Sequence, residues 1–172
     1  MRILHVVEAF GGGLMEMICG VAAGSVREGH HVAIAYGRRP ETPGSVRELV
    51  PPEVELFGLD WGRRTVVEQL AAARALRRLA GRWQPDLIHL HSSLAGAVGG
   101  FALRSFAPTI FTPNSFESAI PSGGRARRLA VRRAERWVVR NASLVGAASP
   151  SEAEVSRALG AKNVTVVENG VS

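Results

Sequence analysis

The chain alternates short apolar runs with longer stretches of helical periodicity from one end to the other, and this alternation restricts its fold more than any other feature. The apolar runs predict strands at residues 3–7, 31–36, 54–57, 87–90, 109–112, 144–147 and 164–167. Several runs lack the polar–apolar alternation of a half-exposed strand, which indicates that helices cover both faces of the sheet. The sequence therefore predicts an α/β fold, a Rossmann-like three-layer sandwich with a mostly parallel sheet.

Helix boundaries are marked by residues that cap free backbone groups. Segments 65–68 and 149–152 both fit the capping box, in which side chains at two positions bind the first amides of a helix. Helices are predicted from about Leu14 and over residues 65–80, 93–105, 124–141 and 150–159. The irregular segment 37–53, with four prolines, is predicted to be a surface excursion and not a domain boundary. Residues 1–172 are thus expected to form one domain.

Composition fits one ordinary globular domain. Of the 172 residues, 46% are hydrophobic and 21% charged, which excludes a disordered chain and a small disulfide scaffold. The single cysteine, Cys19, has no partner for an internal disulfide. Since no targeting segment or transmembrane helix is visible, the expected location is the cytoplasm, either free or peripheral at the inner membrane surface.

The positive charge is concentrated in one predicted helix. Residues 123–140 hold seven arginines and one acid, which accounts for the net charge of +6, since the rest has 14 basic and 14 acidic groups. A helical wheel places arginines opposite Ala126, Ala130, Ala134, Trp137 and Val138. Three uses remain open: a solvated helix, contact of Arg125, Arg128, Arg132 and Arg136 with an anionic membrane, or binding of a phosphorylated acceptor. Nucleic acid is not expected, because aromatic residues are only 6%.

Three glycines, Gly11, Gly12 and Gly13, join the first predicted strand to the first helix. Without side chains there, backbone amides at a helix N-terminus can approach a phosphate or a sugar. The third glycine of the dinucleotide fingerprint is absent. The alternative is that the glycines form only a tight turn.

Polar residues follow two further strands, at the edge where open α/β sheets bind ligands. His91 and Ser92 are predicted to contact substrate, whereas His89 is expected to be a core histidine. No metal site is expected, because no third ligand has a recognisable spacing. After the fifth strand, Asn114, Ser115 and Glu117 can hold sugar hydroxyls, or Asn114 and Ser115 can form a turn of their own.

Four segments, taken together in their order along the chain, resemble the N-terminal half of family 4 glycosyltransferases. They are the three glycines, Gly-His-His-Val at 29–32, Pro-Asp-Leu-Ile-His-Leu-His-Ser at 85–92, and Val-Glu-Asn-Gly-Val at 167–171. The resemblance implies a GT-B architecture, in which two Rossmann-like domains face each other across a cleft. It further implies transfer of a sugar from a nucleotide-sugar donor to an acceptor sugar, lipid or small molecule, with retention of configuration and with no required cofactor or metal.

The same resemblance implies that the chain is the acceptor-binding half, that its hinge lies at 169–171, and that it is inactive alone. Asn114 stands where the family commonly has histidine, which preserves hydrogen bonding to the sugar but removes a titratable base. Two alternatives stay open: half of a nucleotide-sugar epimerase, which shares the architecture, and a stand-alone module that docks on an anionic membrane or polyanion through the arginine-rich helix.

Overall fold

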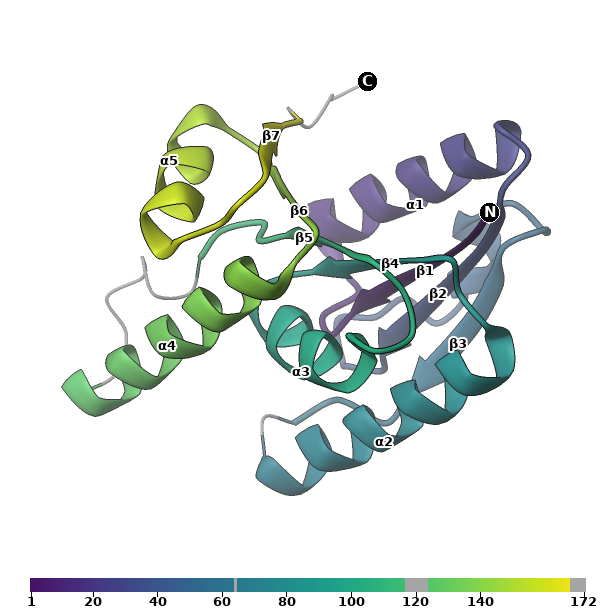
Figure 1. Cartoon of the computed structure of the whole chain (residues 1–172). Coiled ribbons are helices and arrows are strands. Elements are labelled where there is room, and N and C mark those ends of the chain that lie inside the picture. Colours follow the sequence, from purple (N-terminus) through teal and green to yellow (C-terminus); the bar gives the residue numbers. More distant parts are fainter. Residues whose placement is uncertain (64, 117–123, 168–172) are drawn as a thin grey trace.

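A parallel sheet of seven strands lies at the centre of the computed structural model, which describes residues 1–63, 65–116 and 124–167 (Figure 1). The strands are β1 (Arg2–Val7), β2 (His31–Gly37), β3 (Glu55–Leu59), β4 (Leu87–His91), β5 (Thr109–Thr112), β6 (Leu144–Ala147) and β7 (Val164–Val166). The helices are α1 (Gly12–Arg27), α2 (Val66–Trp83), α3 (Ser93–Leu103), α4 (Arg125–Asn141) and α5 (Pro150–Leu159), with a short 3-10 helix η1 (Val46–Leu49). The predicted α/β fold with its parallel sheet is confirmed.

The strand order β3-β2-β1-β4-β5-β6-β7 reverses direction beside β1. From β1 the chain builds outward to β3, then returns through α2 to β4 on the other side of β1. The loops that leave β1 and β4 therefore diverge at their carboxyl ends. Such a point of divergence opens a crevice where ligands bind in open α/β sheets.

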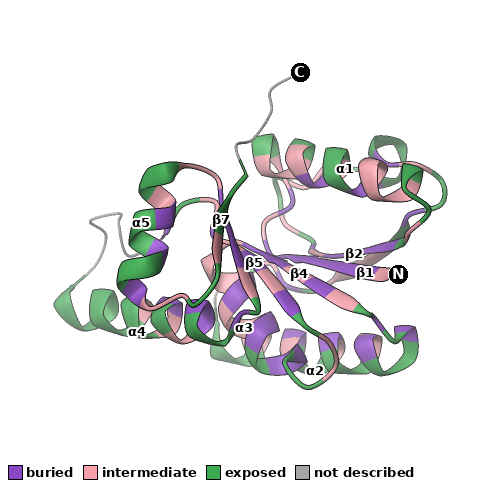
Figure 2. Ribbon diagram, turned by 45° about the horizontal axis from the view of Figure 1, so that its top comes forward, coloured by how far each residue is buried: buried purple, intermediate pink, exposed green. Residues whose placement is uncertain are grey.

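Helices cover the two faces of the sheet unequally. Figure 2 shows α1 on one face and α2, α3 and α4 on the other. Helix α5 packs on β6 and β7 and also contacts α4. Alternation along β1 divides the core accordingly, since Leu4 and Val6 pack with α2 and α3 while Val7 packs with α1.

Two local predictions need correction. Helix α1 begins at Gly12 and not near Leu14, so the glycines form its cap and first turn. The segment 37–53 is also more than a surface excursion, because η1 lies within it and Val46 and Val50 are buried against the core beside α1. In the sequence, both valines have charged residues or prolines as close neighbours, so this segment shows no apolar periodicity that would predict a buried element.

Candidate functional site

The N-terminus of α1 presents free backbone amides at the carboxyl edge of the sheet. Gly11 is the N-cap and supplies no side chain to the first amides, and the first turn holds no acidic residue. Close packing explains Gly11, where a Cβ would lie 3.0 Å from the backbone oxygen of Glu41. Gly12 has φ +56°, whereas a Cβ on Gly13 would meet open space. The uncapped helix end is thus suited to bind an anionic or hydroxyl group.

The loop after β5 holds two consecutive residues in the left-handed region. Asn114 has φ +50° and Ser115 has φ +85°, a conformation that costs free energy for residues other than glycine. The Asn114 side-chain amide donates to the backbone oxygen of Thr112 at 3.3 Å. The Ser115 backbone amide donates to Oε1 of Glu152 at 2.8 Å. The loop is therefore held in a strained shape by contacts on both sides.

Glu152, in the first turn of α5, joins this loop to the next one. Its Oε2 accepts a hydrogen bond from the Ala148 amide at 2.6 Å, while its Oε1 binds Ser115. The Ser149 hydroxyl caps α5 by accepting from the Glu152 amide at 3.2 Å. Half of the predicted capping box is thus present as expected. The Glu152 carboxylate, however, reaches the Ala148 amide and a loop 37 residues earlier, not the N-cap amide.

The start of α1, the loop after β5 and the start of α5 line an open pocket of about 330 Å³. It is lined by Gly13, Leu14, Met17, Asn114, Ser115, Ala148, Ser149 and Glu152. Free amides from α1 lie on one side, and the Asn114 amide, two serine residues and the Glu152 carboxylate contribute on the others. Such a set of directional donors and acceptors suits a polyhydroxylated or anionic ligand.

The structure brings together only some of the predicted site residues. Gly13, Asn114 and Ser115 line the pocket, and Gly11 and Gly12 shape the same helix end. Glu117 and the expected hinge at 169–171 lie outside the described residues.

Ser92 adjoins this edge in a strained conformation. It has φ +76° and ψ 157°, a region occupied almost only by glycine. Its backbone amide donates to the Thr112 oxygen at 3.0 Å, and its buried Oγ has no partner among the described residues. Ser92 does not belong to the pocket lining.

Neither histidine of β4 lines the pocket. His91 is fully buried and does not line the pocket, whereas His89 is only partly buried. The strand continues to His91, so this ring lies beneath the loops rather than among them. Burial lowers the pKa of His5 to about 3 and of His89 to about 4, and it lowers the pKa of His91 well below its usual value. All three rings are therefore neutral at neutral pH.

A third histidine lies beside this pair, although no spacing in the sequence indicates it. The register of β1 and β4 pairs His5 with His89, and ring nitrogens of His5, His89 and His91 lie within 4.8 Å of one another. A sequence separation of 84 residues or more hid this cluster from spacing arguments.

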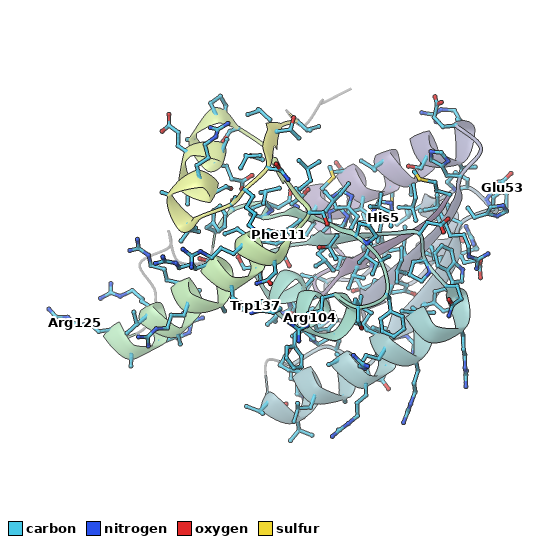
Figure 3. The ribbon with its side chains drawn as sticks, in the orientation of Figure 1. His5, Glu53, Arg104, Phe111, Arg125 and Trp137 are labelled. Carbon is cyan, nitrogen blue, oxygen red and sulfur yellow. The ribbon has the colours of Figure 1, made fainter. Side chains whose placement is uncertain are left out.

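The apolar side of the arginine-rich helix is exposed in its first turns. Ala126 and Ala130 are exposed, and the buried residues are Glu135, Val138 and Val139. The first part of α4 extends beyond the sheet, with Arg125 at its outer end (Figure 3), so none of the described residues covers the two alanines. The candidate contact residues Arg125, Arg128, Arg132 and Arg136 are all exposed.

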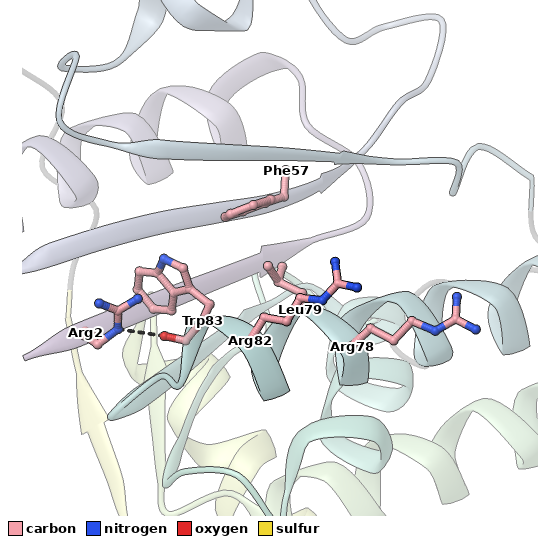
Figure 4. A pocket seen from close by; sticks show the side chains of 6 residues that line it. All are labelled: Arg2, Phe57, Arg78, Leu79, Arg82 and Trp83. Carbon is pink, nitrogen blue, oxygen red and sulfur yellow. Dashed lines mark hydrogen bonds between the residues drawn. The ribbon is translucent and has the colours of Figure 1, made fainter.

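A second pocket of about 330 Å³ lies between β3 and α2 at the amino edge of the sheet (Figure 4). It is lined by Arg2, Phe57, Arg78, Leu79, Arg82 and Trp83. The Arg2 guanidinium lies 4.4 Å from the centre of the Trp83 ring and donates to the Trp83 backbone oxygen at 2.7 Å. Because this pocket is remote from the crevice at the carboxyl edge, the first pocket is the better candidate site.

The model of the glycosyl transferase 4-like domain matches residues 12–170. The chain belongs to this family. A search of curated proteins finds no significant match.

Solved structures share the fold of this glycosyl transferase 4-like domain at low sequence identity. Sucrose-phosphate synthase from Thermosynechococcus elongatus has a TM-score of 0.76 at 17% identity, over 100% of this chain and 49% of that one. HepE of Anabaena, solved with UDP and glucose, has a TM-score of 0.69 at 20% sequence identity, over 100% of this chain and 45% of that one. A UDP-N-acetylglucosamine 2-epimerase described as putative, from Listeria monocytogenes, has a TM-score of 0.69 at 12% sequence identity, over 96% of this chain and 44% of that one. The domain spans about half the length of these structures.

The place of Glu152 in the candidate pocket was not predicted from the sequence. The capping box identifies Glu152 as a helix-end residue. No local pattern indicates that the loop after β5 lies beside it. Among the described residues, no helix combines the length and the apolar character that crossing a membrane requires.

Proposed function

We propose that this domain is the acceptor-binding N-terminal half of a glycosyltransferase, and that its pocket holds the transferring sugar and part of the acceptor. The complete enzyme would transfer a sugar from a nucleotide-sugar donor with retention of configuration. One observation supports this most strongly: the uncapped N-terminus of α1 faces Asn114, Ser115 and Glu152 across a single polar pocket in a family member. The known structure of HepE with UDP and glucose adds support, because it has the same fold.

The chemistry of the pocket suits binding more than proton transfer. Asn114 can donate and accept hydrogen bonds to sugar hydroxyls but cannot take up a proton near neutral pH. Free amides at the start of α1 favour partial negative charge on a departing diphosphate. The donor site and the rest of the catalytic groups would be supplied by a second domain. These 172 residues alone are therefore expected to be inactive. The proposal also includes a cytoplasmic location and transfer that requires no cofactor or metal.

Turnover by the full-length protein tests this proposal. Screening nucleotide sugars against sugar, lipid and small-molecule acceptors should reveal a glycosylated product with the donor's anomeric configuration, while residues 1–172 alone give none. Asn114→Gly removes only the side chain, because glycine accepts φ +50° without strain. It should lower kcat/KM by roughly 10–100-fold through lost hydrogen bonds.

Gln84→Gly is the matched control, since Gln84 also has φ +50° but caps α2 far from the pocket. Equal activity of Asn114→Gly and Gln84→Gly would contradict the assignment of the pocket. Epimerised donor formed without any acceptor would instead favour the epimerase alternative, which shares the fold.

The exposed start of α4 favours a second function, docking on an anionic membrane. Leu129 is 50% exposed among arginines on a helix segment that extends beyond the sheet (Figure 1). An apolar side chain surrounded by guanidinium groups fits the interface of an anionic bilayer. This contact is compatible with sugar transfer to a lipid acceptor, and it also describes a stand-alone binding module.

Liposome sedimentation tests the docking on an anionic membrane. Anionic vesicles should retain the protein, and the triple change of Arg128, Arg132 and Arg136 to Glu should release it. The matched control changes three exposed arginines on α2, Arg74, Arg78 and Arg82, by the same charge. Equal release by both triple variants would mean that only net charge matters, and no binding to anionic vesicles would remove the docking proposal.

A further inference from the structure

Three histidines on two adjacent strands lie together in the interior. His5 of β1 pairs in register with His89 of β4, and His91 is the next residue on the same face of β4. The residues that alternate with them pack into the core on the other face of the sheet: Leu4, Val6, Ile88 and Leu90. The three rings therefore face the α1 side. Figure 3 shows His5 deep in the molecule.

The rings are close enough to share a ligand. Nδ1 of His5 lies 3.0 Å from Nε2 of His91, and the ring centres of His89 and His91 are 4.0 Å apart. One ring nitrogen of each histidine lies within 4.8 Å of the other two. Nε2 of His89 is held by the Thr112 hydroxyl at 2.8 Å. A hydrogen bond of this kind orients a metal-binding imidazole from behind and leaves its Nδ1 as the ligand atom.

The protein alone does not satisfy this cluster. Nε2 of His5 and Nδ1 of His91 are buried and have no partner in the described part of the chain. Because the rings are neutral, one of the pair donates to the other, and the donor keeps a lone pair on its second nitrogen. Either tautomer therefore leaves one buried lone pair without a donor and one buried N–H without an acceptor among the described residues. A position that needed only bulk would be filled at lower cost by an aliphatic side chain.

We propose that His5, His89 and His91 form a binding site for one divalent transition-metal ion, with Zn²⁺ as the expected occupant. Three neutral imidazoles suit Zn²⁺, Co²⁺, Ni²⁺ or Cu²⁺ and not Mg²⁺ or Ca²⁺, which prefer oxygen ligands. His89 is partly exposed, so the ion enters from its side and takes a solvent molecule as the fourth ligand. The ion binds the two facing nitrogens, Nδ1 of His5 and Nε2 of His91, and the proton that they shared moves to the outer nitrogen of its own ring, so both imidazoles stay neutral.

The bound ion is structural. It links β1 to β4 directly below the point where the strand order reverses, and His91 precedes the strained Ser92. Fixing these two strands fixes the start of both loops that leave them. This proposal is independent of sugar transfer, because no histidine of the cluster lines the candidate pocket.

Metal content of the purified full chain, prepared without a histidine tag, is the test. After treatment with EDTA, incubation with ZnCl₂ and gel filtration, elemental analysis should find one Zn²⁺ per chain. Saturation at ~100 times the Kd should raise Tm by roughly 5–10 °C. Co²⁺ should give the visible absorption of a tetrahedral complex. MgCl₂ should change neither the metal content nor Tm.

Variants decide whether these rings bind the metal. His89→Gln keeps the partly exposed position polar, so the protein should stay folded by circular dichroism and lose the retained Zn²⁺. His31→Gln, at an exposed histidine on β2, is the matched control and should retain it. A wild-type protein without zinc, or a His89→Gln protein with as much zinc as the control, would overturn the proposal. If His89→Gln fails to fold, His91→Asn serves as the second variant with the same criteria.

Discussion

Helices α1 and α5 both begin at the candidate pocket, but their N-termini are built in opposite ways. The N-terminus of α5 has a serine cap, a proline in the first turn and the Glu152 carboxylate, which binds amides of two loops. The N-terminus of α1 has a glycine cap with no side-chain hydrogen bond and no acid in its first turn. One helix end is capped from within the protein, and the other has no side-chain cap.

The contrast extends to the surface below each helix. Helix α1 covers the face with the three neutral histidines, whereas α5 packs through Ala153, Ser156 and Leu159. The pocket is thus rigid on the α5 side, where internal hydrogen bonds hold the loops. On the α1 side it is bounded by a helix end that no side chain caps.

Acid should affect the α1 side most, and this is the largest effect that we expect. Folding keeps the pKa of His5 near 3 and of His89 near 4, below the unfolded value of 6.5. The unfolded chain takes up protons on these rings below pH 6.5, whereas the folded protein does not. The free energy of unfolding is therefore highest above pH 6.5 and falls toward pH 4, by up to about 1.4 kcal/mol per pH unit for each ring. Urea unfolding in EDTA at several pH values measures the loss. Hydrogen exchange at pH 5 should show that β1, β4 and α1 lose protection before α5, and the reverse order would break the comparison.

Glu152→Ala should destabilise the protein by about 1–2 kcal/mol, because it removes the charged acceptor of the exposed Ser115 amide and the partly buried Ala148 amide. Chemical denaturation gives the value. Glu154→Ala, at an exposed position on the same helix, is the control and should change stability by less than about 0.5 kcal/mol. Similar losses in both variants would show that the two loops are not held by Glu152.

Ser149→Ala removes the side-chain cap of α5 and should cost about 1 kcal/mol. Ser149→Asp restores an acceptor at the same place and should recover most of that loss. Thermal unfolding of the two variants compares them directly. If the Asp variant were as unstable as the Ala variant, the cap would not be the cause.

Alanine substitutions of Gly13 and Gly12 should distinguish effects on the stability of the protein from effects on ligand binding at the N-terminus of α1. A Cβ on Gly13 meets open space, so stability should stay the same or rise by up to about 1 kcal/mol while the pocket narrows. Gly12 has φ +56°, so its substitution should cost roughly 1 kcal/mol. Denaturation and titration with a nucleotide sugar in the full-length protein give both quantities. Unchanged ligand affinity in Gly13→Ala would mean that ligands avoid this helix end.

Much of the fold could be predicted from local patterns. Helix α5 and strands β5 and β6 lie at their predicted residues, because a capping box and uninterrupted apolar runs determine them locally. The glycines, Asn114 and Ser115 were correctly placed at one edge of the sheet, since parallel strands end on the same side. The burial of His91 was missed, because a strand boundary uncertain by one residue moves a side chain from a loop into the interior.

Sequence alone determined the alternation of strands and helices, the parallel sheet and the glycine-rich start of α1, because each depends on residues within a few positions of one another. The tertiary structure decided three further points: that His5 lies beside His89, that Glu152 reaches the Ser115 amide, and that the first turns of α4 remain uncovered. Each depends on strand register or helix placement across tens of residues. Such contacts form only when the whole sheet is assembled, so no local pattern encodes them.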